Sequence, residues 1–424
     1  MGRFSSSGNT AGSIVLLLPV AGYQNGEFLA AGGRLGVEIV AVSDYCRALA
    51  PMWGLSPLAS VPFDRPLAAL PRVLRALKAR PDAVLAADDH GLELAACLRA
   101  HFELPGNAPE AIRVTRDKYL FRSLLAQGGF CCPAVHVLAD AQQPADLAAA
   151  LDFPVVVKPR RLSTSRGVIR ADSPGAFLRA VAQARRIQAD AAPDDQPLGL
   201  LVERFIPGSE YALEGLLKRG ELRVLALFDK PDPLDGPYFE ETLYVTPSRL
   251  PVEDQKRIAD TVQRACAQAG LTEGPVHAEL RLNSEGVFLL EIAARSIGGL
   301  CGRILRHALG MSLEELILRA ALDWPIPEPG VALAAGVMMI PIPWRGIYHG
   351  VHHLEAARRV PGVEDVQITA LPGQRVSPAP EGSSYLGFIF SRGDRPEGAE
   401  AALRAAHGRL AFDIQPEIRL DKAP

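Results

Sequence analysis

One stretch of the chain, VHAELRLNSEGVFLLEIAARSIGG at residues 276–299, constrains the fold more than any other. Aliphatic residues alternate with polar ones on both sides of a turn-forming cluster, which predicts two strands, Val276–Leu282 and Val287–Ala293. Because successive side chains of a strand point to opposite faces, His277 and Glu279 share one face of the first strand. The pattern therefore predicts an antiparallel hairpin with polar side chains on one face.

The register of this hairpin decides what its carboxylates can do. We expect a three-residue loop, Ser284 to Gly286, with Gly286 in the left-handed conformation, and such a loop places Glu279 directly opposite Glu291. Two facing carboxylates repel each other, and a hard cation such as Mg²⁺ between them would turn this repulsion into a binding site. Solvent-facing glutamates are ordinary on an antiparallel hairpin, so the hairpin alone leaves both interpretations open.

The composition is that of an ordinary soluble globular protein. The chain has 424 residues, 48% hydrophobic and 22% charged, with a formal net charge of −3. This length predicts two or three domains, and the charge balance gives no reason to expect a nucleic-acid or membrane partner. The cysteines lack metal-ligand spacing, so we expect reduced thiols and a cytoplasmic location. They are Cys46, Cys97, Cys131, Cys132, Cys266 and Cys301.

Strand and helix patterns alternate through the first 107 residues, which predicts a doubly wound α/β domain after a flexible segment at 1–12. Ligands of such sheets bind at the carboxyl ends of strands, which makes Asp88, Asp89 and His90 candidates after the strand predicted at 83–86. Aspartate at a strand-to-helix junction is also a common helix N-cap, and this is the interpretation that we favour.

Two lysines lie where an anion could bind. Lys118 is carried by a helix predicted over 108–126, and Lys158 by a strand predicted over 153–159 that is otherwise apolar. The small-residue loop after this strand offers backbone N–H groups and hydroxyls that could form an anion-binding concavity. Its candidate residues are Ser163, Thr164, Ser165 and Gly167. A solvated lysine on an edge strand, followed by a surface loop, is the alternative.

A bend at Pro207 and Gly208 separates two further predicted strands, with Glu203 at the end of one and Glu210 at the start of the next. The exposed backbone of residues 204–206 could read a purine edge, and a carboxylate beyond the bend could accept ribose hydroxyls. This bend alone does not identify a nucleotide-binding site.

Taken in chain order, the segments form a recognisable series. They are RDK around Lys118, VVVKP with its small-residue loop, LVERFIPGSEYALE, VHAEL, and LLEIAARSIGG. Their order and spacing resemble the ATP-grasp superfamily from Ala108 to Trp324. The pairing of VHAEL with EIAAR resembles the carboxylate-amine ligases close to L-amino acid ligases, and the tail segment PGQRVSPAPEGSSYLGFIF is similar to the C-terminal domain of that group.

The resemblance implies a fold class of α/β and α+β in three domains. These are an N-terminal doubly wound α/β (pre-ATP-grasp) domain at 1–107, a two-lobed ATP-grasp domain at 108–325 with a lid lobe at about 115–203, and a small C-terminal α+β domain at 326–424 that packs on the ATP-grasp lobe. The implied cofactors are ATP and Mg²⁺, with Mn²⁺ as a substitute. A homodimer is one oligomeric state that the resemblance leaves open.

The resemblance also implies roles for the matching residues. Contacts to the nucleotide would come from Lys118, Lys158, Ser163, Thr164, Ser165, Gly167, Glu203, Phe205, Ile206 and Glu210. Glu279 and Glu291 would hold Mg²⁺. Arg295 would bind the acyl phosphate or the substrate carboxylate, and His277 would contact the substrate. Ala293 stands where many ATP-grasp enzymes have an asparagine metal ligand, which leaves the number of metal ions open.

The implied reaction is ATP-dependent joining of a small carboxylate to an amine, with amino acids among the candidate substrates, through an acyl phosphate and with release of ADP and phosphate. Two alternatives stay open: an ATP-dependent carboxylase or nucleotide-pathway ligase of the same superfamily, and an ATP-binding module without turnover. The loop LDGPYFEE at 234–241 is a candidate gate for the substrate pocket, or an ordered surface turn.

Overall fold

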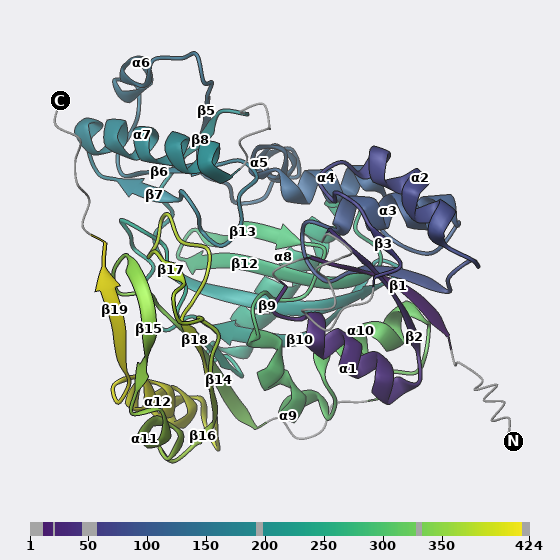
Figure 1. Ribbon diagram of the computed structural model, residues 1–424. Coiled ribbons are helices and arrows are strands. Elements are labelled where there is room, and N and C mark those ends of the chain that lie inside the picture. Colours follow the sequence, from purple (N-terminus) through teal and green to yellow (C-terminus); the bar gives the residue numbers. More distant parts are fainter. Residues whose placement is uncertain (1–11, 20–21, 45–56, 192–197, 328–332, 418–424) are drawn as a thin grey trace, which may run out of the picture.

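The computed structural model describes residues 12–19, 22–44, 57–191, 198–327 and 333–417. Residues 1–11 of the expected flexible segment, and Cys46, lie outside this part of the chain. Four sheets and the helices around them make up the described structure (Figure 1). The mixed α/β fold class expected from the sequence is confirmed.

The N-terminal sheet is parallel, with strand order β3-β2-β1-β4. Its elements are β1 (Ser13–Leu18), α1 (Asn25–Leu35), β2 (Glu38–Ser43), β3 (Ala59–Ser60), α2 (Pro66–Ala76), β4 (Ala83–Ala86) and α3 (Leu92–His101). Ile14 and Leu16 pack in one core with Phe28 of α1, whereas Val15 and Leu17 pack with α2 and α3 in another. Helices therefore cover both faces, which explains the uninterrupted apolar run of β1.

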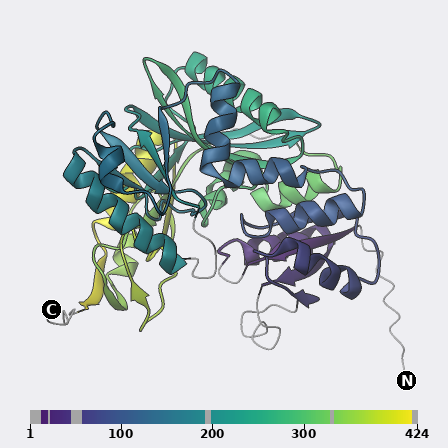
Figure 2. The same ribbon diagram turned by 90° about the horizontal axis from the view of Figure 1, so that it is seen from above.

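A four-stranded antiparallel sheet forms a separate lobe, with strand order β5-β8-β6-β7. Its elements are β5 (Val135–Leu138), α6 (Pro144–Ala148), β6 (Val155–Pro159), β7 (Ile169–Ala171), α7 (Pro174–Ala191) and β8 (Leu200–Arg204). The apolar face of α7, including Phe177 and Val181, packs on this sheet. In both views the lobe lies over the C-terminal strands and away from the parallel sheet (Figures 1 and 2).

The central sheet has eight antiparallel strands in the order β13-β12-β9-β10-β11-β14-β18-β16. Its strands are β9 (Ser209–Lys218), β10 (Glu221–Asp229), β11 (Leu243–Thr246), β12 (Gly274–Asn283), β13 (Gly286–Ala293), β14 (Ala334–Ile340), β16 (Val363–Ile368) and β18 (Gly387–Gly393). Because β11 pairs with β14 over four residue pairs, three strands after residue 333, β14, β16 and β18, continue this sheet directly.

Helices and a small third antiparallel sheet complete the chain. The helices are α8 (Val252–Ala269), the 3₁₀ helix η2 (Cys301–Leu305), α9 (Arg306–Leu309), α10 (Leu313–Ala321), α11 (Leu354–Arg358) and α12 (Pro396–His407). The small sheet has the order β17-β15-β19, from β15 (Gly346–His352), β17 (Arg375–Val376) and β19 (Ala411–Pro416). Among the described helices, none combines the length and the apolar character needed to cross a bilayer.

The single helix expected over 108–126 is wrong. The chain forms α4 (Pro109–Arg116) and α5 (Lys118–Gln127), and Asp117 between them has an extended backbone. The Asp117 side chain accepts hydrogen bonds from the backbone N–H groups of Tyr119 and Leu120, so it caps α5. The break fixes Lys118 at the first position of α5.

The expectation of reduced cysteines is confirmed for the five that the structure describes. None of them is in a disulfide, and neighbouring Cys131 and Cys132 stay unbridged.

Candidate functional site

The β12–β13 hairpin places Glu279 opposite Glu291, as predicted, but for a different reason. The loop has two residues, since Asn283 pairs with Gly286, so the expected three-residue loop is wrong. Gly286 does have a positive φ, of 143°, but as the first residue of β13 and not as a loop residue. A β-bulge supplies the extra residue instead, because Leu280 pairs with Leu289 and the next pair skips Leu290.

This hairpin forms one wall of a cavity of about 190 Å³ between the lobe and the central sheet. Lys118 reaches it from α5: its Nζ donates to the carbonyl of Leu162 at 2.7 Å and lies 3.6 Å from Glu291 Oε2. The cavity therefore brings a cation of one segment against a hairpin carboxylate more than 170 residues away in the sequence.

Lys158 and Glu203 form a buried ion pair at the edge of the same cavity. Lys158 Nζ lies 2.5 Å from Glu203 Oε2, and Arg122 Nε donates to Glu203 Oε1 at 2.7 Å. Burial lowers the pKa of Lys158 to about 8 despite the attraction of Glu203. Although burial opposes its ionisation, the charges of Arg122 and Lys158 hold the pKa of Glu203 below its ordinary value.

The small-residue loop after β6 lines the cavity with Ser163, Thr164 and Ser165. Thr164 and Ser165 have φ of 54° and 53°, so two successive residues are left-handed. Gly167, with φ 70°, instead donates its N–H to the carbonyl of Pro380 at 3.0 Å. The expected phosphate loop is thus split: its hydroxyl residues line the cavity, and the Gly167 amide binds the C-terminal part of the chain.

Phe205 and Ile206, which the sequence singled out for base recognition, both line the cavity. The N–H of Phe205 is engaged by the carbonyl of Pro154 at 2.9 Å. The carbonyl of Ile206 accepts from Arg281 Nη1 at 2.7 Å. The Phe205 ring stacks with that of Phe239, with centroids 6.5 Å apart, so these residues offer an aromatic surface at this end of the cavity.

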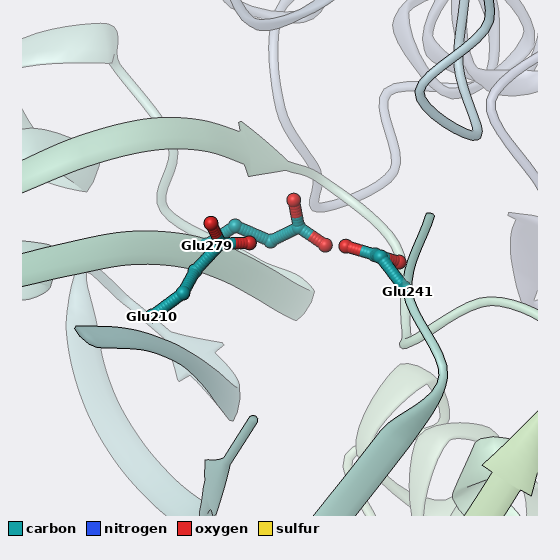
Figure 3. Close-up of side chains that lie close together, drawn as sticks. All are labelled: Glu210, Glu241 and Glu279. Atoms are coloured by element: carbon teal, nitrogen blue, oxygen red, sulfur yellow. The ribbon is translucent and has the colours of Figure 1, made fainter. Parts of the chain in front are cut away.

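Three carboxylates gather in the same cavity, those of Glu210, Glu241 and Glu279, with one oxygen of each within 4.8 Å of the others (Figure 3). Lys230, at the end of the β10 segment, lies among them. Its Nζ is 2.8 Å from Glu210 Oε1, 2.5 Å from Glu241 Oε1 and 3.4 Å from Glu279 Oε1. This ammonium balances part of the negative charge.

The surroundings of Glu241 and Glu279 shift the pKa values of these two carboxyl groups in opposite directions. Burial, together with the charge of Glu279, raises the pKa of Glu241 to about 7. Burial also opposes ionisation of Glu279, but Lys230 and His277 hold the pKa of Glu279 well below its ordinary value. Glu279 therefore stays a carboxylate at neutral pH, whereas Glu241 binds a proton more readily than Glu279 does.

His277 lies between two glutamates. Its Nδ1 is 3.2 Å from Glu214 Oε2, and its Nε2 is 3.5 Å from Glu279 Oε1. Burial disfavours the imidazolium, but the hydrogen bonds and charges of Glu214 and Glu279 outweigh burial and raise the pKa of His277 to about 9. His277 is therefore cationic at neutral pH.

Arg295 lines the cavity just beyond β13. Its Nε donates to Asp89 Oδ2 at 2.8 Å, and its Nη1 to the carbonyl of Ser296 at 2.9 Å. Asp88, by contrast, accepts from the backbone N–H groups of His90 and Gly91. These bonds close a turn ahead of α3, whose N-cap is Gly91 without a side-chain cap, so the favoured N-cap interpretation is wrong. Asp89 instead reaches Arg295 in the site.

The donor set suits a hard divalent cation. Glu279 and Glu291 face each other across the hairpin and both line the cavity, and carboxylate oxygens are the ligands that Mg²⁺ prefers. The cluster of Glu210, Glu241 and Glu279 suits it less well, because the ammonium of Lys230 already lies among these oxygens.

Sequence reasoning missed Lys230, Glu241 and Arg122, and it named Asp89 as a candidate but favoured a helix N-cap for it. One signal was available for Lys230, which follows the apolar run VLALF and Asp229 much as Lys158 follows VVV. The role of Arg122 left no local signal, since a helix arginine is normally solvated and this one is 2% exposed only because it pairs with Glu203.

Two protein families match the chain. An ATP-grasp domain matches residues 151–304, and an L-amino acid ligase C-terminal domain matches residues 338–415. The crystal structure of an L-amino acid ligase from Bacillus licheniformis superimposes with a TM-score of 0.81 and 27% sequence identity, over 96% of this chain and 99% of that one.

Curated relatives match parts of the chain. Carnosine synthase 1 of Gallus gallus is 30% identical over 285 residues, which are 63% of this chain and 30% of the relative. Dapdiamide A synthase of Enterobacter agglomerans is 29% identical over 245 residues, 57% of this chain and 56% of the relative. The chain thus spans less than two thirds of the length of these relatives.

Proposed function

We propose that this chain, which carries an ATP-grasp domain followed by an L-amino acid ligase C-terminal domain, is an ATP-dependent ligase that joins a small carboxylate to an amine. In the reaction, a substrate carboxylate oxygen attacks the γ-phosphorus of ATP, and ADP leaves. The amine then attacks the carbonyl carbon of the acyl phosphate, and phosphate leaves as the amide bond forms.

One observation carries this proposal: two facing carboxylates, Glu279 and Glu291, share a cavity with Lys118, Lys158 and Arg295. Phosphoryl transfer depends on positioning and on neutralising negative charge, and these are the groups that such a transfer needs. An ATP-binding module without turnover would have no use for an arginine fixed beyond the two carboxylates.

Different residues of the cavity would bind different parts of the nucleotide. Lys118, Lys158 and the hydroxyls of Ser163, Thr164 and Ser165 bind the phosphates. Glu210 and the segment of Phe205 and Ile206, which lines the cavity, hold the nucleoside. Glu203 lines the nucleotide end of the cavity, and its ion pair with Lys158 keeps that lysine in place. Mg²⁺ held by Glu279 and Glu291, or Mn²⁺ in its place, would neutralise charge on the phosphate oxygens.

The substrate end of the cavity combines a cation with an apolar wall. Arg295 presents a planar fork that binds a carboxylate or an acyl phosphate, and His277 adds a second positive charge. Ile297, Met339 and Tyr385 line the same cavity. We infer that the carboxylate substrate is an amino acid, with an amino acid or another small amine as its partner.

The test is ADP release over pairs of amino acids and small carboxylates, followed by mass spectrometry of the product. The expected result is ADP formation that needs both a carboxylate and an amine and gives an amide. Bicarbonate-stimulated ADP release without an amine would instead identify a carboxylase. Nucleotide binding without ADP formation over the whole panel would refute the ligase.

The proposal includes the division of the chain into domains at 1–107, 108–325 and 326–424, with residues of about 115–203 as the lid over the nucleotide. It also includes a cytoplasmic location, where free thiols such as those of Cys97 and Cys266 persist.

A further inference from the structure

A second cavity, of about 150 Å³, lies between the parallel sheet and the central sheet and shares no lining residue with the first. Its walls come from β4 and the end of α3, the β9–β10 turn, the start of β12, and α10. A single water molecule needs only about 10–15 Å³ measured in this way. The cavity therefore has room for a small molecule of several non-hydrogen atoms.

Arg99 of α3 lines this cavity without a carboxylate partner among the described residues. Its Nη1 donates to the carbonyl of Val84 at 2.9 Å, and its Nε is enclosed and has no hydrogen-bond partner. Burial alone lowers the pKa of Arg99 to about 10, with no acidic group to offset it. A buried guanidinium without an ion-pair partner is costly for the fold.

The acidic groups around the cavity are engaged elsewhere. Asp82 Oδ2 accepts from the N–H of Ser13 at 2.8 Å, and Glu273 Oε1 from the N–H of Arg219 at 3.0 Å. Asp323 pairs with Lys218. Among the described residues, Arg99 thus has no carboxylate within ion-pair distance, whereas Lys218 has Asp323.

The cavity also adjoins the proposed catalytic wall. Ala294 lines the second cavity, whereas the next residue, Arg295, lines the first. A molecule in the second cavity therefore lies behind the backbone that carries Arg295. The helix that bears Arg99 begins just after Asp89, the partner of Arg295.

We propose that this second cavity is a binding site for a small anion, whose carboxylate or phosphate group pairs with the guanidinium of Arg99. The site does not depend on the ligase proposal, because its residues are outside the nucleotide cavity. Carboxylates and phosphates share the geometry that a guanidinium recognises, and the experiment separates them.

The test is isothermal titration of the full chain with succinate and, separately, with inorganic phosphate, both in saturating MgADP so that the nucleotide site is occupied. We expect binding of at least one probe, and at least tenfold weaker binding in Arg99→Met. Succinate binding alone identifies a carboxylate ligand, and phosphate binding alone a phosphorylated one. Arg80→Met is the matched control, because Arg80 donates to the carbonyl of Phe102 and does not line the cavity.

A second variant keeps the test decisive if Arg99→Met does not fold. Ala320→Phe fills the cavity from α10 and leaves Arg99 in place, so it should also weaken binding at least tenfold. Binding unchanged in Ala320→Phe, or in a folded Arg99→Met, would overturn the proposal, as would the absence of binding of either probe to the unmodified chain.

Discussion

Arg295 and Asp89 form an ion pair, with Nε and Oδ2 2.8 Å apart, that joins the end of the central hairpin to the parallel sheet across 206 residues of sequence. Although burial opposes ionisation of Asp89, the charge of Arg295 holds the pKa of Asp89 below its ordinary value. The pair fixes the guanidinium that we assign to the acyl phosphate, so Asp89 acts as a positioning residue for Arg295.

Asp89→Asn should therefore impair the reaction without impairing nucleotide binding. Displacing a positioned group by about 1 Å can cost about a hundredfold in rate. We expect kcat/KM for the carboxylate substrate to fall by about this factor while the Kd of ADP stays the same. Asp88→Asn, which alters the turn next to it, is the control. A loss of ADP affinity equal to the loss of kcat/KM would contradict this role.

Nucleotide affinity should weaken above pH 8. The pKa of Lys158 is lowered to about 8, so its ammonium loses its proton as the pH rises through 8, and the attraction for phosphate is lost with it. The Kd of ADP should then rise by up to about tenfold per pH unit. Calorimetry between pH 7 and 9.5 measures this. Lys158→Arg stays charged over the whole range and should give a flat profile; a slope that persists in this variant would assign the titration to another group.

His277 should make stability depend on pH. Because its pKa rises from 6.5 to about 9 on folding, its contribution is fully present below pH 6.5 and is lost as the pH rises through 9. The shift corresponds to about 3 kcal/mol. Urea unfolding at pH 6 and pH 9.5 should show this loss in the unmodified chain and a smaller one in His277→Asn. Equal losses in the two proteins would show that His277 is not the titrating group.

Lys230 should matter for folding more than an exposed lysine does. Lys230→Met leaves Glu210, Glu241 and Glu279 without their shared cation, and removing one partner of a buried ion pair typically costs about 3–5 kcal/mol. Lys218→Met is the matched control, since Lys218 pairs with Asp323 on the surface and should cost less than about 1 kcal/mol. Chemical denaturation compares them, and similar losses in both would contradict a structural role for Lys230.

The local patterns of the sequence predicted the strands and the pairing of Glu279 with Glu291, because side-chain alternation and burial fix a register within about one residue. They could not show that the bulge at Leu290 sets this register, since a two-residue loop with a bulge and a three-residue loop align the same carboxylates. The pairing was predicted correctly, and the loop that was meant to produce it was not.

Contacts between residues far apart in the sequence could not be predicted from the sequence. Asp89 follows β4 and looks like a helix cap in its local context, and only the packing of the two sheets brings it to Arg295. The same holds for Arg122, which pairs with Glu203 81 residues away. Such contacts depend on how the sheets pack together, and one sequence carries no local signal of that.

Glu291→Gln tests the central claim most directly. The measurement is ADP release in the presence of ATP, Mg²⁺ and a carboxylate–amine pair that supports turnover of the unmodified chain, with thermal unfolding as the check on the fold. Removing one charge-stabilising group from such a site typically costs about a hundred- to a thousandfold in turnover. We predict a loss of this size with an unchanged melting temperature. Near-normal turnover by Glu291→Gln would contradict the account of this cavity as a ligase site.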